Sequence, residues 1–329
     1  MTSREIILRA INFQGPERIG MTFSGGRLDD MVYGSPARRT YAAAEGARVE
    51  GNMEVYEDEW GNTWHRLIGM SKGGEVRDPV LRDWSQLNGL KLPDYADPSR
   101  YEDMAKTFAE HPDKYRLAGL PGFPFAIMRY MRKMEVFLED VIMYRDEVLE
   151  LQRRVVEVIK QAMRGGAQAG ADGVFYCEDW GTQERLLVSP RMWRELFKPG
   201  YQALLDEAKR LGLAVWMHSC GCITDIIEDL IEVGIKVLQF DQPELHGVDT
   251  LKNRFGGRVA FWTPVDIQKT MQTGDKARIR AAAKDLCEKL GGFNGGFIAK
   301  NYGDLHGIGV DPEWDQWAYE AFVEFGKYR

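Results

Sequence analysis

The feature of this sequence that most restricts its fold is a regular alternation of short apolar runs with longer amphipathic segments. The alternation begins near residue 115 and continues almost to residue 325. Strands that alternate with helices in this way pair in parallel, because each helix carries the chain back to the start of the next strand. The strands predicted in this part of the chain are 115–120, 174–177, 213–217, 237–240, 259–263 and 296–299.

The helices are predicted from the spacing of apolar residues along one face. The longest is expected over 137–169, where Val141, Val148, Leu151 and Val155 recur at helical spacing. Further helices are expected from Pro190 onward and over 224–234, 249–255, 277–290 and 312–325.

The first hundred residues follow a different pattern. Residues 4–11 predict a short helix, and 19–23 predict a seventh strand that stops at Gly25. Between about 49 and 95, aromatic, acidic and glycine residues replace helical periodicity, which indicates a hairpin-rich insertion. We therefore expect residues 1–329 to form a single TIM (β/α)8 barrel, with its eighth strand either short or inside the insertion.

Composition and charge limit the partners of such a barrel. The chain has 43 lysine and arginine residues and 50 aspartate and glutamate residues, which gives a net charge of −7. This charge disfavours nucleic acid and anionic membranes as partners. The chain has no apolar run of the roughly 18 to 20 residues that a membrane span needs, and its amino terminus lacks a signal-peptide core. We expect a cytoplasmic protein with reduced thiols, since four cysteines are too few for a disulfide framework. Nucleotide-binding loops and nucleophile elbows are absent, so nothing local supports nucleotide-driven or serine-hydrolase chemistry.

TIM barrels carry their reactive groups where strands end at the carboxyl face. His218 and Cys220 follow the strand at 213–217 and are two residues apart, so extended geometry points their side chains the same way. Imidazole and thiolate are favoured zinc ligands, and a catalytic zinc needs three protein ligands with one open position. A helix-capping loop with an incidental histidine is the alternative interpretation. For Cys222 and Cys287 the sequence favours packing roles.

The loop 177–183, CEDWGTQ, gathers a thiol, two carboxylates, an indole and an amide after another strand. Its carboxylates are candidates for metal ligands, for an acid or base, or for contacts to a polar group of a substrate. Ordinary turn and cap chemistry explains each of them equally well. Aromatic residues near strand ends either line an apolar pocket or belong to the core. The aromatic candidates are Tyr176, Trp180, Trp216 and Trp262.

Three segments carry a resemblance to a known family. ADGVFYCEDWGTQERLLVSPRMWRELFKPGY at 171–201, HSCGCITDIIEDLIEVGIKVLQFDQPE at 218–244 and RVAFWTPVDIQ at 258–268 resemble the uroporphyrinogen decarboxylase superfamily, and more closely its corrinoid-dependent methyltransferases. The resemblance implies a TIM barrel but leaves the reaction open, because this fold serves several chemistries. Decarboxylases of the family bind porphyrinogen carboxylates with an arginine-rich segment, whereas MTFSGGRLDD at 21–30 offers only Arg27, which argues against a tetracarboxylate substrate.

The resemblance also implies a metal site. The methyltransferase branch binds zinc through a His-x-Cys pair, which His218 and Cys220 match, and through a later cysteine that GGFIAKNYGD near residue 300 lacks. Glu178 is the first candidate to replace that cysteine, followed by Asp179 or Asp241. An oxygen ligand makes zinc more electrophilic than a further thiolate would, which suits activation of an ether oxygen.

The resemblance therefore implies a zinc-dependent methyltransferase. It would move a methyl group from a small methylated substrate, such as a methoxylated aromatic held by the tryptophans, to the cobalt of a corrinoid (cobalamin) carried by a partner corrinoid protein. The residues expected to be catalytic are Glu178, Asp179, His218 and Cys220, and those expected to bind substrate are Tyr176, Trp180, Gln183, Trp216, Asp241, Trp262 and Asn301.

Three alternatives stay open at the level of sequence. One is methyl transfer from a methylcorrinoid to a thiol or tetrahydrofolate. Another is a metal-independent decarboxylase or lyase in which Asp179 or Asp241 stabilises charge. The last is a barrel without catalytic activity that binds a corrinoid protein or a small ligand.

Overall fold

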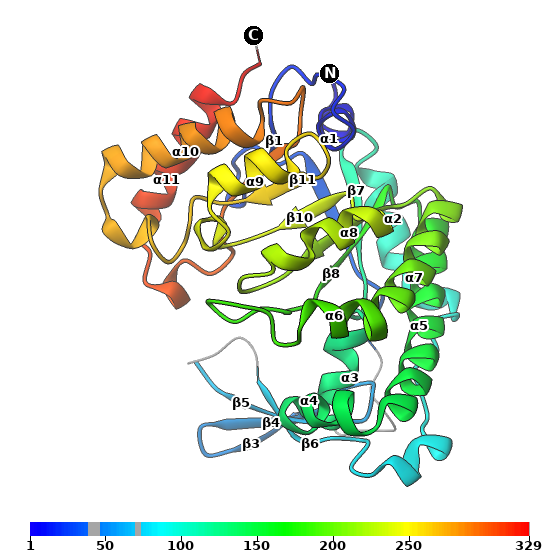
Figure 1. Cartoon of the computed structure of the whole chain (residues 1–329). Coiled ribbons are helices and arrows are strands. Elements are labelled where there is room, and N and C mark those ends of the chain that lie inside the picture. Colours follow the sequence, from blue (N-terminus) through cyan, green and yellow to red (C-terminus); the bar gives the residue numbers. More distant parts are fainter. Residues whose placement is uncertain (39–46, 70–73, 329) are drawn as a thin grey trace.

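The computed structural model describes residues 1–38, 47–69 and 74–328, and within them eight parallel strands form a nearly closed barrel surrounded by helices (Figure 1). The alternation predicted from the sequence is confirmed, and the seven predicted strands are all present. In sheet order the strands are β1 (Gly20–Thr22), β12 (Phe297–Lys300), β11 (Ala260–Thr263), β10 (Val237–Gln239), β9 (Ala214–His218), β8 (Gly173–Cys177), β7 (Tyr115–Gly119) and β2 (Met31–Gly34). The helices are α1 (Ser3–Ile11), α2 (Glu102–Glu110), α3 (Pro124–Arg132), α4 (Met134–Met143), α5 (Arg145–Gln168), α6 (Pro190–Met192), α7 (Lys198–Leu211), α8 (Ile227–Val233), α9 (Val248–Phe255), α10 (Lys276–Leu290) and α11 (Pro312–Phe325).

The eighth strand is β2, which pairs in parallel with β7. It has 4 residues, so the expectation of a short eighth strand is confirmed. It precedes the insertion, so the other expectation, a strand inside 49–95, is wrong. The sequence MVYG is too short to show a strand pattern by itself, and only its pairing with β7 defines it.

A buried aspartate joins the two ends of the barrel sheet, where β1 meets β2. The Asp30 carboxylate accepts hydrogen bonds from the Met21 backbone N–H at 2.9 Å and from the Ser3 hydroxyl at 2.6 Å. The Arg18 guanidinium pairs with it at 2.6 Å. The Asp30 side chain thus satisfies a backbone N–H at a seam where strand pairing is incomplete.

The predicted helix 137–169 is two helices. The chain turns at Tyr144, between α4 and α5, where φ is −131° and ψ is 52°. Apolar residues keep a helical spacing on both sides of this turn, so periodicity alone does not reveal the interruption.

The predicted hairpin-rich insertion is confirmed as an antiparallel sheet in the connection between β2 and α2. This connection follows the carboxyl end of β2, and Figure 1 shows the sheet beside α3 and α4. The ring of Trp64 lies 4.8 Å from that of Tyr130 on α3. The described strands of this sheet are β3 (Arg48–Glu50), β4 (Met53–Glu57), β5 (Thr63–Leu67) and β6 (Glu75–Asp78).

Alternate residues of the barrel strands fill the lumen, and α1 closes its amino end. The lumen core is the smaller of two buried clusters, and the larger one lies between the barrel and its helices. Among the described residues, no helix has both the length and the apolar character needed to cross a bilayer. The lumen core contains Ile7, Ala10, Ile11, Met31, Tyr115, Leu117, Trp216, Val237, Ala260 and Ile298.

Candidate metal centre

Strand alternation at the end of β8 decides which of its residues reach the barrel mouth. Cys177 pairs in register with His218 of β9. Side chains of a strand alternate between two faces, so Asp179 shares the face of Cys177, whereas Glu178 shares that of Tyr176. Tyr176 and Glu178 are both fully buried on the helix side of the strand.

Asp179, His218 and Cys220 form a group that could hold a metal ion. One ligand atom from each lies within 4.8 Å of the others. The Nε2 atom of His218 is 3.2 Å from the Cys220 Sγ atom and 3.5 Å from an Asp179 carboxylate oxygen. The structure thus brings together the His-x-Cys pair and one of the carboxylates predicted beside it.

Glu178, our first candidate for the third ligand, does not lie in this group. Its carboxylate accepts hydrogen bonds from the Ala126 backbone N–H at 3.1 Å and from the Trp180 indole N–H at 3.2 Å. Burial raises the pKa of Glu178 to about 8, despite the hydrogen bonds and the charge of Arg129, which lower it. A shift of one position along a strand moves a side chain to the opposite face, which is why Asp179 takes the place expected for Glu178.

The charges around Cys220 fit a bound cation. Desolvation raises the pKa of the Cys220 thiol to about 12, and the charges of Asp179 and Asp241 act in the same direction. Burial also acts to raise the pKa of Asp179, but His218, the Cys220 amide and Arg129 outweigh it, and the net shift is downward. A thiol beside carboxylates stays protonated unless a metal ion replaces its proton. Imidazole, thiolate and carboxylate are also the donor types that zinc accepts.

The loops that carry Asp179 and Cys220 are bonded to each other. The Trp180 backbone N–H donates to the Ser219 hydroxyl at 3.2 Å, and the Cys222 N–H donates to the Thr182 carbonyl at 2.7 Å. Gly221 has φ +76°, and a Cβ atom there would lie 2.2 Å from the Gly181 backbone. Only glycine permits this approach, which holds the two ligand loops together.

A chain of polar contacts continues from His218 across the mouth. Its Nδ1 atom contacts the Gln239 side-chain carbonyl. The Gln239 amide donates to Asp241 at 2.8 Å, and the Lys300 ammonium donates to the same Asp241 oxygen at 2.9 Å. Gln239 and Lys300 were not among the residues predicted from sequence, although strand alternation places both on the lumen face.

Two of the aromatic residues predicted to bind substrate belong to the core. The ring of Tyr176 stacks on Phe123 at 3.5 Å, and that of Trp180 stacks on Phe125 at 3.9 Å. Both lie between the barrel and the helices, because their positions alternate with those that face the lumen.

The other two predicted tryptophans do face the lumen. Trp216 is fully buried there, and its indole N–H donates to the Tyr115 hydroxyl at 3.1 Å. Trp262 is half-buried, donates to Thr22 at 2.7 Å, and lies under the Lys300 ammonium, which is 5.3 Å from its ring centroid.

The amides predicted at the mouth have separate surroundings. Gln183 is exposed and donates to the Gln242 side chain at 3.4 Å. Asn301 is buried, accepts a hydrogen bond from the Ser24 backbone N–H at 3.1 Å, and donates to the Tyr302 carbonyl at 3.1 Å. Asn301 therefore connects the loops after β12 and β1.

A pocket of about 170 Å³ opens beside Cys220. His246, which the sequence did not single out, lies in its wall and contacts the Thr224 hydroxyl at 2.9 Å. Burial lowers the pKa of His246 to about 4, so this imidazole is neutral at pH 7. The pocket is lined by Ser219, Cys220, Gly221, Phe240, Asp241, Gln242, His246, Ile267 and Tyr302.

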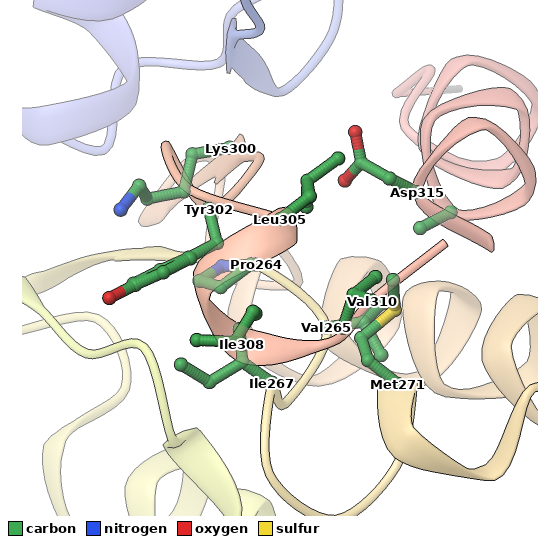
Figure 2. A pocket seen from close by; sticks show the side chains of 11 residues that line it. Pro264, Val265, Ile267, Met271, Lys300, Tyr302, Leu305, Ile308, Val310 and Asp315 are labelled. Atoms are coloured by element: carbon green, nitrogen blue, oxygen red, sulfur yellow. The ribbon is translucent and has the colours of Figure 1, made fainter. Parts of the chain in front are cut away.

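A second cavity adjoins the first and is drawn in Figure 2. Ile267 and Tyr302 line both of them. Its other walls are mostly apolar, with Val265, Met271 and Val310 grouped together in Figure 2. The mouth thus has a polar side at the metal group and an apolar side behind Tyr302.

A parallel barrel with a His, Cys and Asp group at the carboxyl ends of its strands defines a TIM-barrel protein with a candidate metal centre at its mouth. The family model described as uroporphyrinogen decarboxylase (URO-D) matches residues 67–327. The chain belongs to the uroporphyrinogen decarboxylase family, as its sequence resemblance implies.

Solved structures with this fold include a methyltransferase from Methanosarcina mazei. It is 18% identical, the match covers 77% of this chain and 73% of that one, and the TM-score is 0.61. A D-psicose 3-epimerase is 12% identical over 73% of this chain and 85% of its own, with a TM-score of 0.39. A 3-keto-L-gulonate-6-phosphate decarboxylase from Vibrio cholerae is 12% identical over 68% of this chain and 78% of its own, with a TM-score of 0.32. No curated protein matches the sequence.

Proposed function

We propose that this protein is a zinc-dependent methyltransferase, which moves a methyl group from a small methoxylated substrate to the cobalt of a corrinoid on a partner protein. The observation that carries the proposal is the group of Asp179, His218 and Cys220 beside a pocket at the barrel mouth. Membership of the uroporphyrinogen decarboxylase family supports it, as does the shared fold with a protein described as a methyltransferase.

The chain's own residues supply the ligands. His218 through Nε2, Cys220 through Sγ and Asp179 through its carboxylate would hold the zinc. Three protein ligands leave a fourth tetrahedral position for an oxygen of the substrate. Zinc bound there would act as a Lewis acid on that oxygen, which helps it to leave as an alkoxide or phenolate.

The pocket limits the size of the substrate. Its volume of about 170 Å³ suits a small molecule. Phe240, Ile267 and Tyr302 give it apolar walls that would hold the carbon skeleton of a methyl ether. Arg27, the cation in the segment where decarboxylases of the family bind carboxylates, is paired with Asp315 at 2.8 Å.

Transfer would break the bond between the methyl carbon and the oxygen and leave its electron pair on the oxygen. A corrinoid in its reduced cob(I)alamin state, presented by the partner at the open carboxyl face, would supply the electron pair with which the methyl group is accepted. His218, Cys220 and Asp179 keep their places throughout, because their loops are bonded to each other. Their role is to position the oxygen and to stabilise the charge that develops on it.

The experiment has two readouts: the zinc content of protein purified without chelators, and methyl transfer from methoxylated aromatics to a reduced corrinoid protein. We expect near-stoichiometric zinc and measurable transfer in the wild type, and loss of both in Cys220→Ala. Cys222→Ala is the matched control, because Cys222 bonds to Thr224 outside the group. Unchanged transfer in Cys220→Ala would refute the metal assignment, and a metal-free protein that releases CO₂ from a carboxylated substrate would favour the decarboxylase alternative.

A further inference from the structure

We infer that Gln239, Asp241 and Lys300 form a positioning chain that fixes the proton of His218 on Nδ1 and leaves Nε2 free as a ligand atom. The inference deepens the proposed function. It rests on that function for one point, the role of Nε2 as a metal ligand. None of these three residues belongs to the metal group itself. They act through His218 and are therefore positioning residues.

The chain begins at Lys300, on the lumen side of β12. Its ammonium is a donor without acceptor capacity and lies 2.9 Å from an Asp241 carboxylate oxygen. The side chains of Lys300 and Asp241 are 15% and 14% exposed, so water competes weakly with this ion pair. Asp241 is therefore held as a carboxylate, which only accepts hydrogen bonds.

The carboxylate orients the amide of Gln239. Since Asp241 only accepts, Gln239 must turn its NH₂ group toward it, and the two groups are 2.8 Å apart. The Gln239 carbonyl oxygen then faces His218. Gln239 is 3% exposed and pairs in register with His218 on the neighbouring strand, so its amide has no room to rotate into solvent.

The amide in turn selects the tautomer of His218. An amide oxygen only accepts, so the Nδ1 atom that contacts it must carry the proton. In the neutral ring Nε2 then keeps its lone pair, and that lone pair faces Cys220 and Asp179. A hydrogen bond at one ring nitrogen commonly decides which nitrogen of a histidine binds metal.

The same contacts keep Asp241 out of the metal group. The hydrogen bonds from Gln239 and Lys300 both meet one carboxylate oxygen of Asp241 and hold it on their side of the mouth. The ligand set therefore stays at three protein groups, and the fourth position stays open for a substrate. Lys300 and Asp241 lie 59 positions apart, so this arrangement depends on the closure of the barrel.

The test measures the tautomer directly in the metal-free full-length chain. Long-range ¹H–¹⁵N spectra of labelled histidine distinguish a proton on Nδ1 from one on Nε2, and His218→Ala identifies the signal among the 5 histidines. We expect the wild type to carry the proton on Nδ1, and Gln239→Met to lose this preference. Gln202→Met is the matched control, because Gln202 is exposed on α7 and donates to Asp206, which lies outside the metal group.

A second measurement links the tautomer to metal binding. Zinc affinity, measured by competition with a chelator, should fall by about 10- to 100-fold in Gln239→Met and stay unchanged in Gln202→Met. Asp241→Asn serves if Gln239→Met fails to fold, because an asparagine no longer dictates the orientation of the Gln239 amide. A proton on Nε2 in the wild type, or a preference for Nδ1 that survives these variants, would overturn the inference. The NMR readout needs neither zinc nor substrate, so it separates failure of the inference from failure of the proposed function.

Discussion

The two sides of the chain segment at the end of β8 have opposite chemical characters. Toward the lumen, Asp179 meets His218 and Cys220, and its pKa is lowered. Toward the helices, Glu178 and Trp180 are fully buried among aromatic rings, and the pKa of Glu178 is raised to about 8. Two neighbouring carboxylates thus differ because one meets cations and donors while the other is enclosed in apolar protein.

The contrast shows how one loop serves the site and the core together. Residues on the helix side anchor the loop, and residues on the lumen side present ligands from it. A change on the helix side should therefore alter stability before it alters metal binding, and a change on the lumen side should do the reverse.

The largest expected effect comes from Trp180→Ala, on the helix side. Trp180 is fully buried, stacks on Phe125 and donates to the Tyr201 hydroxyl at 2.9 Å. Its removal should lower the free energy of unfolding by about 3–5 kcal/mol, as measured by urea denaturation. Trp262→Ala, in the half-buried lumen position, should cost less. Equal losses in the two variants would contradict the assignment of Trp180 to the core.

The next effect comes from Asp179→Ala, on the lumen side. Losing one of three ligands should weaken zinc binding by about 100-fold or more, because the remaining imidazole and thiolate hold the ion less well. Chelator competition measures this change. Glu178→Gln is the control on the opposite face, and we expect it to retain zinc binding. If Glu178→Gln loses zinc and Asp179→Ala keeps it, our third ligand is the wrong carboxylate.

Glu178 should also make stability depend on pH. Its folded pKa of about 8 exceeds its ordinary value of 4.5, so between these values the folded state holds a proton that the unfolded state has released. Stability is then lost as pH rises, by on the order of 1.4 kcal/mol per pH unit across this range. Thermal unfolding of the wild type and Glu178→Gln from about pH 5 to about pH 8 measures the slope. The variant lacks the titrating group and should show a flatter profile, and parallel profiles would show that Glu178 is ionised in the folded protein.

The smallest effect is expected from Lys300→Met. It removes the donor that holds Asp241 but leaves every ligand of the metal group in place. We expect zinc affinity to fall by about 10-fold, at the low end of the range for groups that act through a ligand. Lys289→Met, which breaks an exposed ion pair with Asp249, is the control. A loss as large as that of Asp179→Ala would indicate that Lys300 does more than position its neighbours.

Much of this architecture was predictable from local pattern. The alternation of strands and helices predicted the barrel, and the spacing of His218 and Cys220 predicted that their side chains would meet, as they do at 3.2 Å. The strand β2 and the turn at Tyr144 were missed because neither leaves a periodic signal. Tyr176 and Trp180 were expected in a pocket because an aromatic residue at a strand end carries no mark of the face it occupies.

The sequence by itself determined the alternation that closes a parallel barrel and the pairing of His218 with Cys220, because both depend on residues close together along the chain. Only the tertiary structure decided that Asp179 and not Glu178 joins them, and that Gln239, Asp241 and Lys300 connect to His218. These contacts cross between strands, and the register of the strands sets which side chains meet. A shift of one residue reverses the face of every side chain, so local pattern could not decide them.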